Sequence, residues 1–208
     1  MDIQRLLTKY GENEPIFTEE IMGEFSEYSR PRVFQLINSA VENGTLARFD
    51  KGVYYIPTQT RYGQSVLTVE QVVQKKYVAD KGEVFGIYGR LILQLNFLLS
   101  YQVPNAIEVI TNNETMRVRE IELQGRRVVL RKSRCKINKD NAAAYTIMEL
   151  FSDIDLEQYK ENSSVRREVF GYIKENKIVR NELSALTSVF PARTTKNLME
   201  SGLIYEIA

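Results

Sequence analysis

The chain has 208 residues, 43% of them hydrophobic and 26% charged, which is typical of an ordinary globular protein with room for two or three small modules. It has no histidine and one cysteine, which excludes Ser-His-Asp triads, Cys-His dyads, histidine-ligated or all-cysteine zinc sites and iron–sulfur clusters. The phosphate-binding patterns GxxxxGK[ST] and GxGxxG are also absent. We therefore expect a non-catalytic protein with no metal or cofactor.

The net charge of +1 conceals a strong segregation of charge along the chain. Residues 1–28 hold seven acids and two bases, residues 29–62 hold five bases and two acids, and residues 117–139 hold nine bases and two acids. A local basic face steers a protein onto phosphates even when the overall charge is small. No apolar run is long enough to span a bilayer and no signal-peptide core begins the chain, so we expect a cytoplasmic protein without a membrane partner.

The first sixty residues predict three helices. Apolar residues recur at helical spacing over residues 2–10, and a second helix is expected to begin at Thr18. Ser29 is a good N-cap for a third helix that ends at Asn43-Gly44, with Pro31 in its tolerant first turn. The buried stripe of that third helix is expected to comprise Val33, Phe34, Ile37, Ala40 and Val41.

A β-hairpin is expected directly after these helices, because residues 45–49 and 53–57 are strand-like and Asp50-Lys51-Gly52 is a turn sequence. Three helices followed by a hairpin are the order of a winged helix-turn-helix, whose third helix enters the major groove of DNA. The candidate DNA-binding residues are Ser29, Arg30, Arg32, Gln35 and Asn38 on the third helix, Arg48 and Lys51 on the wing, and Arg61 beyond it. The alternative is that this is only a solvated helix face of a domain that contacts other proteins.

The middle of the chain predicts helices and a small antiparallel sheet. Thr68 and Gln71 form a capping-box pattern at the start of a helix over 69–80, and a second, buried helix is expected over 84–98. Gly86 and Gly89 would then serve close helix packing. Strands are expected over 107–111, 117–123 and 126–133, with Gln124-Gly125 as the turn between the last two.

The remainder of the chain predicts helices, beginning after Asn141, after Ser164, and over residues 181–190 and 192–202. Their order is similar to that of the N-terminal helices, so they could form a second helix-turn-helix-like unit, or equally a bundle against the sheet. The sequence therefore predicts an α+β protein with a winged helix-turn-helix over 1–62, a mixed helix-and-sheet domain over 63–155 and a helical segment over 156–208.

Three segments also carry a resemblance to a known family. The run LINSAVENGTLARFDKGVYYIPTQTRYG resembles the N-terminal domain of the AbiEi-like antitoxins of bacterial abortive-infection, type IV toxin–antitoxin systems. NFLLSYQVPNAIEVITN resembles the middle region of that family, and NAAAYTIMELFSDID resembles the helix after its sheet. The resemblance covers roughly residues 15–155, and it places the aromatic wing of the family on Gly52, Tyr54 and Tyr55 and the basic wing tip on Lys51.

The resemblance implies that the winged helix binds the double-stranded DNA of its own promoter as an autorepressor. It also implies that the remainder of the chain opposes a cognate nucleotidyltransferase toxin. A basic strip on the expected strands fits a surface for that toxin or its RNA substrate, and a second DNA contact is the competing interpretation. The strip comprises Arg117, Arg119, Arg126, Arg127, Arg131, Lys132 and Arg134. Neutralisation of the strip by the acid-rich residues 140–161 would leave it without a binding role.

Two other functions compete with the antitoxin hypothesis. The protein would be a stand-alone regulator if its C-terminal region senses a small ligand. It would be a metal-dependent phosphotransferase if Asp153 and Asp155 bind a metal, although helix capping explains Asp155 better. Cys135 lies among basic residues that would lower its pKa, but with no second thiol it is interpreted as incidental and as typical of a reducing compartment.

Overall fold

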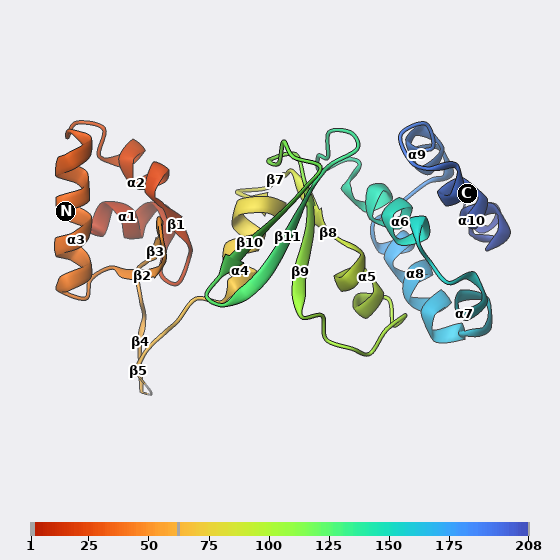
Figure 1. Cartoon of the computed structure of the whole chain (residues 1–208), viewed down its shortest axis with the longest axis horizontal. Helices are drawn as coiled ribbons and strands as arrows, with labels where there is room; N and C mark the ends of the chain where they lie inside the picture. The colour runs from red at the N-terminus through yellow and green to blue at the C-terminus, as the bar shows by residue number, and fades with distance from the viewer. Residues whose placement is uncertain (1–2, 62, 208) are drawn as a thin grey trace. The chain divides into compact units, whose positions relative to one another are not determined.

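A computed structural model describes residues 3–61 and 63–207. The chain belongs to the α+β class and divides between Lys75 and Lys76 into two compact units, Met1–Lys75 and Lys76–Ala208 (Figure 1). The division therefore falls after the expected boundary at residue 62. None of the described helices is both long and apolar enough to cross a membrane.

Among its described residues, the first unit contains four helices and two small antiparallel sheets. Its elements are α1 Ile3–Tyr10, β1 Ile16–Phe17, α2 Thr18–Glu24, α3 Arg30–Glu42, β2 Ala47–Asp50, β3 Val53–Tyr55, β4 Gln59–Thr60, β5 Gly63–Gln64 and α4 Val69–Val73. Strands β1, β3 and β2 form one sheet in that order, and β4 pairs with β5. Strand β1 was not expected, because two residues are too few to show an alternating pattern.

The glycines expected at the end of α3 and in the hairpin turn have the predicted backbone conformation. Gly44 and Gly52 have φ values of 75° and 77°, the left-handed conformation that a helix end and a tight hairpin require. Leu6, Ile16 and Ile37 are fully buried in the core. The prediction for Phe34 is wrong, because its side chain is 37% exposed.

The second unit begins with the end of a π-helix, η1 Gln74–Val78, and contains a four-stranded sheet and seven helices among its described residues. Its further elements are β6 Ala79–Asp80, β7 Glu83–Val84, β8 Gly86–Tyr88, α5 Arg90–Asn96, β9 Ala106–Thr111, β10 Val118–Leu123, β11 Arg126–Lys132, α6 Ala142–Ser152, α7 Leu156–Glu161, α8 Ser163–Glu175, α9 Arg180–Leu186, α10 Ala192–Glu200 and α11 Leu203–Glu206. The sheet order is β10-β11-β9-β8. Strands β9 and β11 are parallel, so the sheet is mixed rather than wholly antiparallel.

The helix expected over 84–98 is wrong in its first half, which forms β7 and β8. A Cβ on Gly86 would lie 2.0 Å from the carbonyl oxygen of Tyr77, so this glycine lets the chain pass against the backbone of the π-helix. A Cβ on Gly89, the N-cap of α5, would lie 2.3 Å from Glu108 Cγ. Both glycines thus allow close packing, as expected. Gly86 packs against the backbone of the π-helix and Gly89 against the side chain of Glu108, so neither packs one helix against another.

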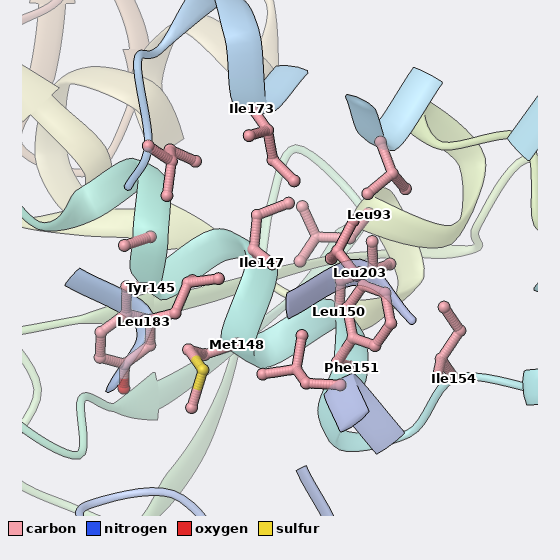
Figure 2. Packing of buried hydrophobic residues seen from close by; sticks show 14 of the residues in the cluster. Leu93, Tyr145, Ile147, Met148, Leu150, Phe151, Ile154, Ile173, Leu183 and Leu203 are labelled. Atoms are coloured by element: carbon pink, nitrogen blue, oxygen red, sulfur yellow. The ribbon is translucent and has the colours of Figure 1, made fainter. Parts of the chain in front are cut away.

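Helix α6 is the centre of the hydrophobic core of the second unit. Figure 2 shows Tyr145, Ile147, Met148, Leu150 and Phe151 of this helix surrounded by side chains from other elements of the same core. These include Leu93 of α5, Ile173 of α8, Leu183 of α9 and Leu203 of α11. Residues on both sides of the expected boundary at 155 therefore share one core.

Candidate nucleic-acid interface

Helix α3 presents one polar side, because its apolar side is buried in the first unit. Val33, Ile37 and Ala40 are buried at helical spacing. The predicted residues Ser29, Arg30, Arg32, Gln35 and Asn38 are all exposed. Ser29 is the N-cap residue as expected, but its side chain accepts no hydrogen bond from the helix.

The exposed side chains of α3 are held by weak contacts among themselves. Arg32 Nη1 donates a hydrogen bond to Gln35 Oε1 at 3.2 Å. The Arg30 guanidinium lies 5.9 Å from the centroid of the Phe34 ring, a cation–π distance. These contacts orient the polar groups outward, and a duplex could replace them.

The β2–β3 hairpin approaches α3 through Arg48. Its guanidinium lies 5.5 Å from the centroid of the cross-strand Tyr54 ring, and its Nη2 donates a hydrogen bond to Asn38 Oδ1 at 3.4 Å. Lys51 is exposed at the hairpin turn, where its backbone N–H donates to Asp50 Oδ1. Arg61 is exposed in the turn between β4 and β5, outside this hairpin. Tyr62, which could stack on bases, lies outside the described residues.

Charge pairing leaves the α3 side of the first unit positive. Glu24 of α2 pairs with Lys9 and lies 3.7 Å from Arg5, which pairs with Glu27 at 2.8 Å, and Glu20 pairs with Lys75 at 3.0 Å. By contrast, over residues 3–61 and 63–207 no ion pair involves the basic residues of α3 and the hairpin, which are Arg30, Arg32, Arg48 and Lys51. Three acids of residues 1–28, namely Glu20, Glu24 and Glu27, are thus compensated by bases outside α3 and the hairpin.

The predicted basic strip of the second unit is not one continuous face. Arg127 and Arg131 share one face of the sheet with Glu120 and Glu108, because these residues alternate with Arg119 and Lys132 in the strand register. Arg126 is half-buried at the start of β11.

Much of the strip is also paired. Arg127 donates to both carboxylate oxygens of Glu120, and Arg131 Nε lies 2.5 Å from Glu108 Oε1. Arg119 lies 3.7 Å from Glu114 and Arg134 lies 3.8 Å from Glu149. Of these four acids, only Glu149 comes from the acid-rich segment 140–161; Glu108 and Glu120 lie on strands of the sheet, and Glu114 lies between β9 and β10.

The carboxylates of the possible metal site, Asp153 and Asp155, both make structural contacts. Asp155 caps α7 by accepting hydrogen bonds from the backbone of Glu157 and Gln158, and Asp153 pairs with Arg90 and lies 3.7 Å from Arg193. Burial raises the pKa of the Cys135 thiol, so the lowering expected from its basic neighbours is wrong.

The second unit contains a cavity that no sequence pattern indicated. Its volume is about 360 Å³, and it lies between β8, α5, α6 and α8. Leu93, Phe97 and Tyr172 give it apolar walls, and Glu168 and Glu175 stand at its edge. Only Gly171, a glycine within a helix, could have pointed to it, because a missing side chain in α8 leaves open space.

The chain matches no family model, and its comparison with curated proteins gives no significant match.

Proposed function

We propose that the protein is a non-catalytic cytoplasmic regulator that binds double-stranded DNA through α3 and the β2–β3 hairpin and represses its own promoter. The observation that carries this proposal is the exposed polar side of α3 beside an unpaired basic hairpin. The element order α1-β1-α2-α3-β2-β3, with β1 pairing to β3, supports a winged helix-turn-helix.

In this proposal α3 lies in the major groove, where Arg32, Gln35 and Asn38 contact base edges. Arg48 and Lys51 contact phosphates beside the groove, which positions the protein without sequence preference. The hydrogen bond from Arg48 to Asn38 keeps the hairpin close to the base-reading side of α3 in the free protein.

A gel-shift titration of the full-length protein on the DNA upstream of its gene tests the proposal. We expect saturable binding that exceeds binding to an unrelated duplex of equal length and weakens with salt. Equal affinity for the two duplexes would exclude a sequence-specific repressor.

We further propose that the protein acts as an antitoxin against a nucleotidyltransferase-type toxin, on the strength of the resemblance over residues 15–155. Growth rescue on co-expression with an adjacent nucleotidyltransferase-like gene tests this role. Charge reversal at Arg126 and Arg127 should reduce rescue and leave promoter binding unchanged if the strip contacts the toxin or its RNA substrate. Arg131 should stay intact in that variant, because its replacement by glutamate would face the buried Glu108.

A ligand-sensing regulator is the second candidate, and the cavity in the second unit favours it. Apolar walls with two carboxylates at the edge suit a small hydrophobic amine. Gly171→Leu should fill the cavity, because no atom within 4 Å opposes a Cβ at that position. If hydrophobic amines change promoter affinity in the parent protein and not in Gly171→Leu, the sensing function is supported; no effect in either protein excludes it for this class of ligand.

A further inference from the structure

A small hollow in the second unit is lined by four basic residues and by two largely buried polar residues, Tyr145 and Glu149. Its volume is about 120 Å³, and it lies where the end of β11 and the residue before β10 meet α6. The lining residues are Ile110, Arg117, Arg131, Lys132, Arg134, Tyr145 and Glu149. None of them belongs to the DNA-binding face proposed for the first unit.

The hollow carries an excess of positive charge. Arg131 pairs with Glu108, and Arg134 lies 3.8 Å from Glu149, too far for a hydrogen bond. Arg117 and Lys132 form no ion pair with any described residue. Four cations against these two carboxylates give a net charge of +2 with both acids ionised. An anion with two negative charges would balance this excess.

Tyr145 supplies a buried hydroxyl beneath these cations. The residue is 0% exposed, and its hydroxyl oxygen accepts the backbone N–H of Arg134 at 2.8 Å. Figure 2 shows this oxygen at the margin of the hydrophobic cluster, directed away from the aliphatic side chains. Burial raises the pKa of Tyr145 to about 12, so the hydroxyl keeps its proton at neutral pH. No acceptor for that proton is found among the described residues, and an unmade hydrogen bond of this kind is costly.

Glu149 is the second buried polar group of the hollow. Its side chain is 13% exposed, and its Oε2 has no hydrogen-bond partner among the described residues. Burial raises the pKa of Glu149 against the opposing effect of Arg134. A neutral carboxylic acid can donate a hydrogen bond to an oxyanion, whereas the ionised form repels it.

We propose that this hollow binds the dianionic phosphate of a phosphate monoester or of free inorganic phosphate, with Arg117 and Lys132 supplying uncompensated charge and Tyr145 donating a hydrogen bond. The charge favours a terminal phosphate over an internal phosphodiester, because the hollow's net charge of +2 exceeds the single charge of a diester.

Isothermal titration calorimetry on the full-length protein tests the site with inorganic phosphate, adenosine monophosphate and adenosine, at constant chloride concentration. Saturable binding of inorganic phosphate alone identifies the free anion as the ligand. Tighter binding of adenosine monophosphate than of inorganic phosphate, with no binding of adenosine, identifies a phosphate monoester as the ligand. Absence of saturable binding by both phosphates overturns the proposal. So does equal binding by dimethyl phosphate, a small phosphodiester with a single negative charge.

Variants decide whether these residues form the site. Arg117→Ala and Lys132→Ala should each weaken phosphate binding about tenfold, the effect of losing one charge-assisted hydrogen bond. Arg127→Ala is the matched control, because Arg127 lies on the same sheet outside the hollow, and it should leave affinity unchanged. An equal loss of phosphate affinity in Arg127→Ala would mean that phosphate is attracted to the charge of the whole sheet, and it would overturn the proposed site.

Glu149→Gln should strengthen phosphate binding, whereas the two alanine variants should weaken it. The variant removes the negative charge of the ionised carboxylate and supplies an amide N–H donor in its place, so phosphate should bind several-fold more tightly. Glu122→Gln, which neutralises an exposed strand carboxylate outside the hollow, should have no effect. Weaker binding by Glu149→Gln, in a protein at least as stable to heat as the parent, would show that Glu149 does not face the anion.

Discussion

Arg48 of the hairpin donates a hydrogen bond to Asn38 of α3, so two residues proposed to contact DNA are joined in the free protein. The same guanidinium covers the Tyr54 ring, which is itself buried. The hairpin is therefore positioned against α3 before any DNA is bound. An interface of this kind loses less conformational entropy on binding than a mobile wing would.

Replacement of the base-reading side chains tests the role of α3. Arg32→Ala and Gln35→Ala should each lower affinity for the upstream promoter by about 1–3 kcal/mol and should change binding to an unrelated duplex much less. Gel-shift titration on both duplexes measures the difference. Arg5→Ala is the matched control, because Arg5 pairs with Glu24 and Glu27 and lies outside α3. Full promoter affinity in the double variant Arg32→Ala/Gln35→Ala would exclude α3 as the recognition helix.

The hairpin should contribute charge rather than sequence preference. Lys51→Ala should weaken binding to all duplexes alike and should reduce the slope of log K against log salt concentration by about one, because one phosphate contact is lost. Titrations at several salt concentrations measure that slope. A loss confined to the promoter sequence would instead assign Lys51 to base recognition.

Two glycines of the second unit should respond to alanine in opposite directions. Gly86→Ala places a Cβ against the Tyr77 carbonyl oxygen and should destabilise the unit by about 1–3 kcal/mol, as overpacking does. Gly171→Ala meets open space within α8 and should stabilise the unit by about 0.5–1 kcal/mol through helix propensity. Urea unfolding followed by circular dichroism compares them. Equal stability of the two variants would contradict the close contact at Gly86.

The buried carboxyl of Glu149 predicts a pH dependence of stability. Burial raises its pKa in the folded state above its ordinary value of 4.5, so the folded state holds the proton more tightly than the unfolded chain. The associated stability is fully present below pH 4.5 and is lost as pH rises through the folded-state pKa. The advantage of Glu149→Gln over the parent protein should therefore grow as pH rises from 4.5 towards neutrality. Thermal unfolding in a pH series measures this difference, and a difference independent of pH would contradict the raised pKa.

The sequence by itself determined the local features of the fold. The side chains of Thr68 and Gln71 form the expected capping box, and Asp155 caps its helix as expected. Gln124-Gly125 forms the expected turn, with φ values of 49° and 76°. These features depend on side chains and backbone groups within a few residues of each other, so a short stretch of sequence contains all the interacting groups.

Only the tertiary structure decided the features that join distant segments. The apolar run after Gly82 fits a helix or a buried strand equally well, and pairing of β8 with β9 selects the strand. The pairing of Arg131 with Glu108 depends on β11 lying beside β9, and the burial of Glu149 and Tyr145 depends on how the sheet meets α6. Glu108 within the apolar strand IEVIT was a visible sign of a buried charge, but its partner Arg131 comes from another strand. Such contacts depend on strand order and register, which a single sequence does not encode in any local pattern.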